Sequence, residues 1–269
     1  MDLKTCKTRG NEVDADLRAT AAFLAEYASL LSGCGATCIR IEKNTARMAK
    51  AFGVNFDIFI MPSHVSVSVW DNDRANAVVA QRKTVNCGIS FTLNAGLSRL
   101  SWEVADMHLD LYAATERFGR IKEIRSTGKW EALILTSFAN ASFCRLFGGD
   151  LTAILIVFIS TLAGYGLKQI MLEEKCDIRL TFLCASFFSA SLSAGGEIFN
   201  IGSTPEIALG TSVLYLIPGV PYINSVSDMI YRHYLCAFSR FLDAAVLTAC
   251  LSIGLCAGML ILGLKWYVG

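Results

Sequence analysis

The residues best suited to chemistry lie at the edges of long apolar segments. The stretch LIPGVPYINSVSDMI, residues 216–230, brings five such residues together: Pro218, Gly219, Pro221, Asn224 and Asp228. Proline removes a backbone donor and glycine adopts dihedral angles that other residues avoid, so a helix that enters this stretch should break. The freed backbone groups are tolerated in an apolar environment only where they meet protein or water. Asn224 and Asp228 are four residues apart and could face one cavity, although a plain boundary between helix and loop remains the alternative.

Two further charged residues border apolar runs. Asp150 ends the sequence FGGD, and Arg240 precedes the last apolar segment. A charge at membrane depth is costly unless it is paired or wet, so it is a candidate for a functional role. Arg240 could balance a carboxylate, and Asp150 or Asp228 could carry a proton. Snorkelling of these side chains toward the lipid headgroups is the alternative.

A third polar cluster lies near the amino terminus, in GATCIRIEKN, residues 35–44. Arg40 and Glu42 are two positions apart on an expected helix and do not face each other, so each should contact a different neighbour. Cys34 and Cys38 are spaced i,i+4, which could place two thiols on one helix face. Because no matching group of His or Cys residues completes a site, we predict reduced structural thiols, no metal and no cofactor.

The charged residues divide the chain near residue 130. Of the 47 Asp, Glu, Lys and Arg residues, 31 fall in residues 1–129 and 16 in residues 130–269. The second part carries long apolar runs separated by short breaks, which is typical of membrane helices. The mean hydropathy of +0.47 agrees with this. We therefore predict a membrane protein with a cytosolic α+β domain, residues 1–129, followed by an α-helical transmembrane domain, residues 130–269.

In residues 1–129 the spacing of the apolar residues changes twice. Apolar residues recur at helical spacing from Leu17 to Leu31 and again over residues 36–53. Alternation over 56–60 and 65–69 then predicts two antiparallel strands, and residues 77–85 predict a third. Helices return from residue 91 to Arg125, so the expected order is ααβββαα.

The second part predicts about five transmembrane helices, at about 130–147, 150–171, 179–196, 206–222 and 241–264. Arg117, Arg120 and Lys122 precede the first span, and basic residues mark the cytoplasmic side of a membrane. No apolar signal segment is seen at the start of the chain. We therefore expect a multi-pass protein of the cell (inner) membrane, in contact with lipid, with a cytoplasmic amino terminus.

Two general classes of function receive little support. The net charge of +1 gives no bias toward nucleic acid, and no nucleotide-binding Gly-x-x-x-x-Gly-Lys-Ser/Thr motif occurs. An enzyme could use Glu42 with His64 or His108 as acid and base, and Ser63 or Ser66 as nucleophile. No Gly-x-Ser-x-Gly motif accompanies these residues, so we expect no enzyme.

Three segments resemble the threonine/serine exporter family, in particular the larger subunit of its two-component, succinate exporter-like type. The first is GATCIRIEKN, which matches through Gly35, Ala36, Arg40 and Glu42 but departs at Thr37, Cys38 and Lys43. The others are FGGD, residues 147–150, and PGVPYINSVSD, residues 218–228, with Arg240 downstream.

The resemblance implies a subunit of a secondary, proton-driven exporter of small polar metabolites, either threonine and serine or succinate-like dicarboxylates. Such transporters have about ten spans, so the resemblance also implies a second small membrane subunit, a homo-oligomer, or both. The substrate would lie near the broken helix at Pro218 and Pro221. A membrane-anchored hydrolase and a regulatory scaffold, both using the cytosolic domain, remain as alternatives.

Overall fold

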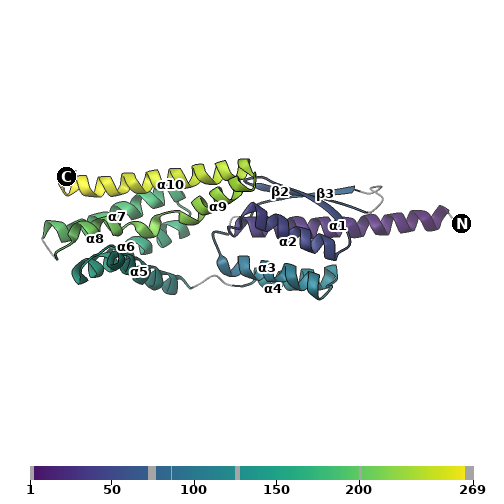
Figure 1. Ribbon diagram of the computed structural model, residues 1–269, viewed down its shortest axis with the longest axis horizontal. Coiled ribbons are helices and arrows are strands. Elements are labelled where there is room, and N and C mark those ends of the chain that lie inside the picture. The colour runs from purple at the N-terminus through teal and green to yellow at the C-terminus, as the bar shows by residue number, and fades with distance from the viewer. Residues whose placement is uncertain (1–2, 72–76, 86, 125–127, 200–201, 264–269) are drawn as a thin grey trace. The chain divides into compact units, whose positions relative to one another are not determined.

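The computed structural model describes residues 3–71, 77–85, 87–124, 128–199 and 202–263. Two compact units make up the chain, the first of Met1–Ser126 and Val220–Phe241, the second of Thr127–Gly219 and Leu242–Gly269 (Figure 1). The helices and strands are α1 (Leu3–Gly33), α2 (Cys38–Ala51), β1 (Asn55–Ile60), β2 (His64–Trp70), β3 (Ala77–Lys83), α3 (Phe91–Asp106), α4 (Leu111–Lys122), α5 (Lys129–Leu146), α6 (Leu151–Glu173), α7 (Ile178–Ile198), α8 (Pro205–Thr211), the 3-10 helix η1 (Leu214–Leu216), α9 (Gly219–Ile230) and α10 (Tyr234–Ile261).

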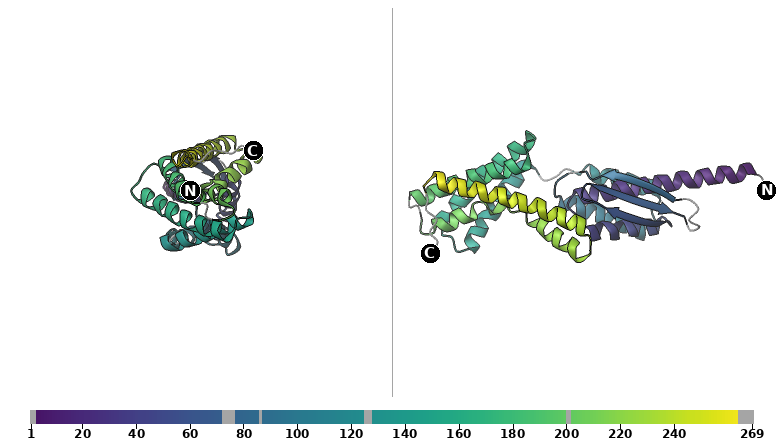
Figure 2. Two further views of the ribbon diagram at one scale, coloured as in Figure 1. Left: turned by 90° about the vertical axis from the view of Figure 1, so that its left-hand side faces the viewer. Right: turned by 90° about the horizontal axis from the view of Figure 1, so that it is seen from above.

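The first unit contains an antiparallel sheet in the order β1-β2-β3. Alternate residues of β2 point to opposite faces, so Val65, Val67 and Val69 are fully buried in a core shared with α1 and α2. Figure 2 shows the three strands side by side with α1 along them. On the other face Phe59 and Val79 are exposed. The predicted order ααβββαα is thus confirmed for residues 3–122.

The helices of this unit are joined by polar contacts as well as by the core. The hydroxyl of Tyr27 on α1 donates to the carbonyl of Leu97 on α3, over 2.8 Å. Arg47 on α2 donates to Ser101 on α3, and its guanidinium lies 3.6 Å from the ring centroid of Trp102. These contacts fix α2 between α1 and α3, and with it the loop that precedes α2.

The segment Val220–Phe241 belongs to the first unit, whereas the sequence placed it in the transmembrane part. It forms α9 and the beginning of α10, which turn back on each other through Arg232, a residue with a φ of 66°. The hydroxyl of Ser225 donates to the carbonyl of Ala237 over 2.8 Å. Cys236 is buried in the same core as the sheet. Most of its large apolar side chains, among them Ile223 and Leu235, are exposed, so the segment joins the first unit through Cys236 and through polar groups rather than through a large apolar face.

The second unit buries polar side chains among small apolar clusters and exposes many large apolar side chains. Ser160 and Thr161 of α6 and Ser189 of α7 are buried, while Leu135 and Phe138 of α5 are more than half exposed. Gly254 and Gly258 of α10 leave space for the backbone of α7, because a Cβ at either position would crowd it. Small residues four apart allow such close approach of membrane helices. An apolar exterior over an interior that contains hydrogen-bonded polar groups suits a lipid environment.

Three described helices are long and apolar enough to cross a membrane: α6, residues Ile178–Gly196 of α7, and α10. A fourth span is added if Pro205–Leu216 and Gly219–Ile230, which are sharply bent at a short break, count as one. The predicted break at Pro218 is thus confirmed. The expected span at 130–147 forms helix α5 but is not among these candidates, and this helix carries Lys129, Glu131 and Arg145.

Candidate functional site

The two polar clusters singled out in the sequence meet within the first unit. Asp228 on α9 is fully buried, and its Oδ1 accepts a hydrogen bond from the backbone N–H of Cys38 over 2.8 Å. Cys38 is the first residue of α2. The first N–H groups of a helix have no partner within the helix and carry the positive end of its dipole. The carboxylate of Asp228 therefore caps α2 from a distant part of the chain.

Arg240 on α10 holds both the carboxylate and the loop. Its Nη1 lies 2.9 Å from Oδ2 of Asp228 as an ion pair, although the angle between them is not that of a hydrogen bond. Its Nη2 donates to the carbonyl of Ala36 over 2.8 Å. A buried charge is tolerated when it is paired and hydrogen-bonded. The half-buried guanidinium of Arg240 thus compensates the charge of the fully buried Asp228 carboxylate.

Asn224 completes this arrangement. Its Nδ2 donates to the carbonyl of Gly35 over 2.9 Å. Gly35 has a φ of +88°, a conformation that favours glycine, and a Cβ there would lie 3.2 Å from the side chain of Ile89. Asn224 and Asp228 share one face of α9, as their spacing predicts, and that face contacts the loop before α2. We call this arrangement the polar clamp; it comprises Asn224, Asp228 and Arg240 with the backbone of Gly35, Ala36 and Cys38.

Arg40 and Glu42 lie next to the clamp and contact different neighbours, as their spacing predicts. The Nη1 of Arg40 donates to Oδ1 of Asn94 on α3 over 2.9 Å. Glu42 lies 3.6 Å from Nε2 of His233, in the turn between α9 and α10. Glu42 thus adds a second link between α2 and the segment that carries the clamp.

Two buried thiols border the clamp. The pKa of Cys38 is raised, because its thiol is hydrogen-bonded to Cys236 and is buried. The Sγ of Cys236 donates to the carbonyl of Ile60 over 3.4 Å. The expectation that Cys34 and Cys38 share a helix face is wrong, because the turn at Gly35 separates the end of α1 from the start of α2. No group of three or more His, Cys, Asp or Glu residues that could hold a metal occurs in the described ranges.

The remaining predicted site residues lie elsewhere. Asp150, in the second unit, caps α6: its Oδ1 accepts from the backbone N–H of Ala153 and its Oδ2 from that of Ser203, each over 2.8 Å. These backbone hydrogen bonds lower the pKa of Asp150 to about 2. Pro218 lies between η1 and α9, and Pro221 lies in the first turn of α9, where proline is tolerated. A Cβ on Gly219 would meet no atom within 4 Å.

The second unit also contains buried polar groups that the sequence did not single out. Nδ2 of Asn140 on α5 donates to Oγ1 of Thr161 over 2.7 Å and to the carbonyl of Thr211 over 3.1 Å. Ser189 on α7 lies 2.9 Å from the hydroxyl of Tyr215. A polar residue inside an apolar run was the available signal, but nothing in a single sequence shows which of many such residues face one another.

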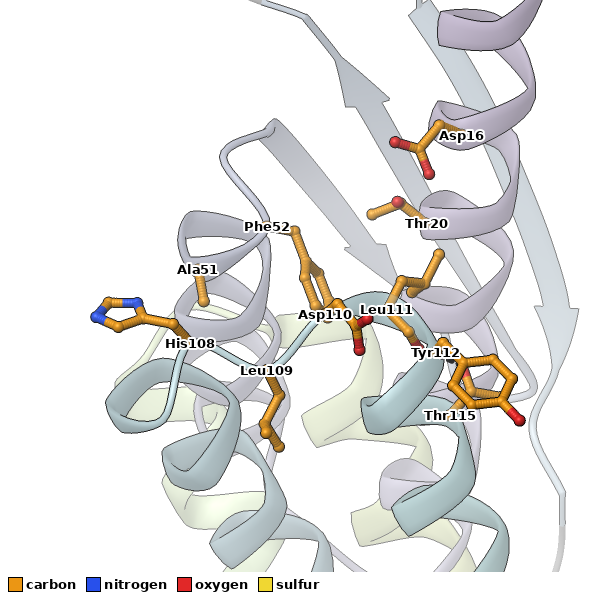
Figure 3. Close-up of a pocket in the computed structure, with 10 residues that line it drawn as sticks. All are labelled: Asp16, Thr20, Ala51, Phe52, His108, Leu109, Asp110, Leu111, Tyr112 and Thr115. Atoms are coloured by element: carbon orange, nitrogen blue, oxygen red, sulfur yellow. Dashed lines mark hydrogen bonds between the residues drawn. The ribbon is translucent and has the colours of Figure 1, made fainter.

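The first unit also has an open pocket of about 700 Å³ (Figure 3). Asp16 and Thr20 of α1, Phe52 after α2, and Asp110 at the start of α4 line it. Asp110 caps α4 by accepting from the N–H of Ala113 over 2.9 Å. The imidazole of His108 points away from the other labelled side chains in Figure 3. His108, an acid–base candidate in the sequence, is therefore not paired with the carboxylates of this pocket.

The other residues considered for catalysis are also not assembled. Ser63 Oγ lies 3.3 Å from Nδ1 of His64, but both side chains are exposed. In the described part of the chain, no hydrogen bond or ion pair joins this histidine to a carboxylate that could orient it. Glu42 contacts a different histidine, His233. The geometry thus lacks the base and orienting group that a nucleophile requires.

Comparisons with known proteins agree with these features. A family model described as "Putative threonine/serine exporter" matches residues 22–262. The "Probable succinate transporter subunit YjjP" of Klebsiella aerogenes is 24% identical over 254 residues, which cover 93% of this chain and 97% of that protein. The protein of the same name from Escherichia coli K12 is 25% identical over 236 residues, which cover 87% of this chain and 91% of that protein. No solved structure matches the chain. Because the family model spans most of its length, the chain belongs to the threonine/serine exporter family, a family of transport proteins rather than enzymes.

Proposed function

We propose that this chain is one subunit of a secondary exporter of small polar metabolites, driven by the proton gradient. The observation that carries the proposal is the second unit, in which buried hydroxyl and amide groups are surrounded by apolar side chains that face outward. Family membership supports export of threonine or serine, and the names of the two relatives support a succinate-like dicarboxylate. The sequence has no nucleotide-binding P-loop, which favours an ion gradient as the energy source.

Helix α5 is proposed as an additional membrane segment. Its charged residues lie at its two ends, with Lys129 and Glu131 at the start and Arg145 at the finish. Between them, Leu135 and Phe138 are exposed and apolar. Charged side chains at the ends of a span can reach the headgroups. Counting α5 with the other candidates gives the five spans expected from the sequence, with a cytoplasmic amino terminus in the inner membrane.

A partner is proposed because five spans are few for a complete transporter of this type. The two relatives are named as subunits, which agrees with a multi-component assembly. The partner would be a second small membrane protein, a second copy of this chain, or both.

The polar clamp is proposed as the element that couples proton movement to transport. The groups that face Asp228 are Arg240 and Cys236 on α10 and Cys38 on α2. A proton on Asp228 would remove the negative charge that Arg240 and the start of α2 require. The loop before α2 would then lose its hold on α9 and α10, and Pro218 and Gly219 provide a break at which α9 could move.

The test is efflux from cells that lack their own exporters. Cells are loaded with radiolabelled threonine, serine or succinate, and the chain is expressed alone and with a candidate small membrane subunit. We expect efflux that collapses when a protonophore is added. Absence of efflux of all three solutes from cells with correctly inserted protein would refute the proposal. Efflux that persists with the protonophore would refute only the proton drive.

The matched variants for the clamp are Asp228→Asn and Asp106→Asn. Asp106 is an exposed carboxylate at the end of α3 in the same unit. We expect Asp228→Asn to abolish export at normal membrane levels and Asp106→Asn to leave it unchanged. Normal export by Asp228→Asn would remove this carboxylate from the mechanism.

A regulatory role of the first unit is the second candidate, supported by the pocket in Figure 3. Its two carboxylates, Asp16 and Asp110, lie around the apolar surface of Phe52, so it could hold a small cationic effector. The variant Asp16→Asn should then change the dependence of export on cytoplasmic amine concentration without changing the maximal rate. An unchanged concentration dependence would exclude this pocket as the sensor.

A further inference from the structure

A connected group of polar residues, five of them buried and Tyr165, Lys168 and Tyr215 half-buried, runs through the second unit along one side of α6. We call it the polar seam and define it by Asn140, Ser160, Thr161, Tyr165, Lys168, Ser189, Thr211 and Tyr215. Its members come from α5, α6, α7, α8 and the 3-10 helix η1. Ionisable side chains inside a membrane bundle, such as that of Lys168, are rare, face the interior, and often mark the path of a solute.

The centre of the seam is built around Gly164. A Cβ at this position would overlap both the hydroxyl of Ser189 and that of Tyr215, so only glycine leaves room for the two groups. Ser189 donates its one hydrogen to the carbonyl of Ser160 over 3.1 Å. The hydroxyl of Tyr215, 2.9 Å away, must therefore be the donor to Ser189. The lone pairs of Tyr215 are left to accept from another donor.

Asn140 supplies an unused acceptor. Its Nδ2 donates both hydrogens, one to Thr161 and one to the carbonyl of Thr211. Because a carbonyl oxygen can only accept, the amide nitrogen must face it, and this fixes the orientation of the amide. Its Oδ1 has no partner among the described residues, although the side chain is only 2% exposed. A buried acceptor without a donor costs free energy, about 1–3 kcal/mol. A solute that brought a hydroxyl, an ammonium or a protonated carboxyl group would satisfy it.

Lys168 supplies a cation at the other end. Its Nζ lies 5.4 Å from the ring centroid of Tyr165 and 4.9 Å from that of Phe182. Among the residues that the structure describes, no carboxylate pairs with it. An aromatic face stabilises an ammonium but leaves its donors free for an anion. A long side chain on a helix leans toward the preceding turn, and the ring of Tyr165 beside this ammonium in turn contacts the ring of Tyr215, with centroids 6.0 Å apart.

We propose that the polar seam is the substrate-binding site of the exporter and that it takes a small solute with one carboxylate and one hydrogen-bond donor. The carboxylate binds Lys168, and the donor binds Oδ1 of Asn140 or the hydroxyl of Tyr215. A hydroxy amino acid has both groups, and so does a dicarboxylate that carries one proton. A fully ionised dicarboxylate lacks the donor and would leave its second charge without a cation. This inference rests on the proposed export function and adds the site and the protonation state of the substrate.

The first test measures binding to the full chain, purified in lipid nanodiscs together with any partner that supports export. The probes are radiolabelled serine and radiolabelled succinate, each over a range of pH that spans the titration of succinate. We expect Lys168→Met to weaken binding by about 10- to 100-fold, because a hydrogen-bonded charge is lost. Lys168→Arg should retain most of the affinity. Lys175→Met is the matched control, since Lys175 is an exposed lysine just after the same helix.

The pH dependence of binding shows whether serine or succinate is the substrate. If serine is the substrate, its affinity should be constant with pH while both carboxylate and ammonium are ionised. If succinate is the substrate, its affinity should rise as the pH falls through its second pKa. Asn140→Ala should weaken the binding of either solute, and Ser142→Ala, an exposed change on the same helix, should not.

The second test is efflux, which distinguishes failure of the site from failure of the function. The site is supported if the wild type exports the solute and Lys168→Met exports it with a raised KM and a similar maximal rate. Export with an unchanged KM in both Lys168→Met and Asn140→Ala overturns the site while the export function stands. A wild-type chain that neither binds nor exports either solute overturns both.

Discussion

Asp228 and Cys38 are joined by a buried hydrogen bond across 190 positions of the sequence, with the carboxylate Oδ1 2.8 Å from the backbone nitrogen. The carboxylate thus occupies the place that a capping side chain would normally take at the start of a helix. Thr37, which precedes α2, makes no such side-chain bond. The helix that carries Arg40 and Glu42 therefore depends for its first turn on a residue of α9.

The ion pair of the clamp should be important for the stability of the first unit. Asp228 is fully buried and the side chain of Arg240 is 21% exposed, so removing one partner leaves the other charge poorly solvated. Arg240→Met should reduce stability by about 3–5 kcal/mol. Hydrogen exchange at the backbone amide of Cys38 in the full chain measures this locally. Glu116→Gln, which removes an exposed pair with Arg120, should cost less than about 1 kcal/mol.

A double-mutant cycle separates the pair from general packing. If the two charges stabilise each other, Asp228→Asn with Arg240→Met should be less destabilising than the sum of the single changes, by roughly 1–3 kcal/mol. Strict additivity would mean that the two side chains act independently, and the clamp would then lose its basis.

Gly35 should be required for the loop that the clamp holds. Its φ of +88° costs a residue with a Cβ about 1–2 kcal/mol, and that Cβ would also press on Ile89. We expect Gly35→Ala to lower the free energy of unfolding by at least this amount and to speed hydrogen exchange at the start of α2. Gly119→Ala, in the middle of α4 with no atom near its Cβ, should instead stabilise by about 0.5–1 kcal/mol. Equal effects of the two changes would show that the conformation of Gly35 is not limiting.

The sequence predicted local structure well because local structure depends on residues near one another. The alternation of Val65, Val67 and Val69 predicts β2 with its buried face, and the prolines at 218 and 221 predict the break before α9. It also placed Asn224 and Asp228 on one face, since that requires only helical spacing. It could not predict that this face binds the loop at Gly35, because no local pattern records a contact 189 positions away.

Other differences have equally physical causes. Helix α10 begins at Tyr234, before the expected start of the last span at residue 241, and in its first turns Cys236 packs in the core of the first unit while Leu235 and Phe238 are exposed. Helix α5 was expected as a span on its apolar middle, but charged residues at both ends lower its mean hydropathy. Asn140 could not be singled out, because no local pattern shows that its amide faces Thr161, 21 positions away.

Asp150 should stay ionised throughout the physiological range of pH. Its pKa is lowered from 3.8 to about 2 by hydrogen bonds from the backbone of Ser203 and Ala153. A carboxylate whose pKa is lower in the folded than in the unfolded state stabilises the fold at pH values above its unfolded pKa. This stabilisation is lost as the pH falls through the folded pKa. We therefore expect the thermal stability of wild type relative to Asp150→Asn to be constant above about pH 4. The difference should shrink as the pH falls toward about 2.

The same shift argues against Asp150 as the carrier of the coupling proton. Asp150→Asn should keep the pH dependence of export, even where the weakened cap of α6 reduces the rate. Loss of the pH dependence in this variant, together with its persistence in Asp228→Asn, would reverse the assignment of the proton between the two carboxylates.

Gly164 should be the glycine of α6 that export tolerates least. A methyl group at this position would displace the hydroxyls of Ser189 and Tyr215 and lie 3.2 Å from the carbonyl of Ala185. Overpacking of this kind typically costs about 1–3 kcal/mol. We expect Gly164→Ala to lower the melting temperature in detergent and to reduce export at least tenfold at equal membrane levels. Gly166→Ala changes the same helix two residues away, where a Cβ would meet nothing within 4 Å, and should leave both measurements unchanged. If export in the two variants is the same, the space at Gly164 is not part of the transport path, whatever its effect on stability.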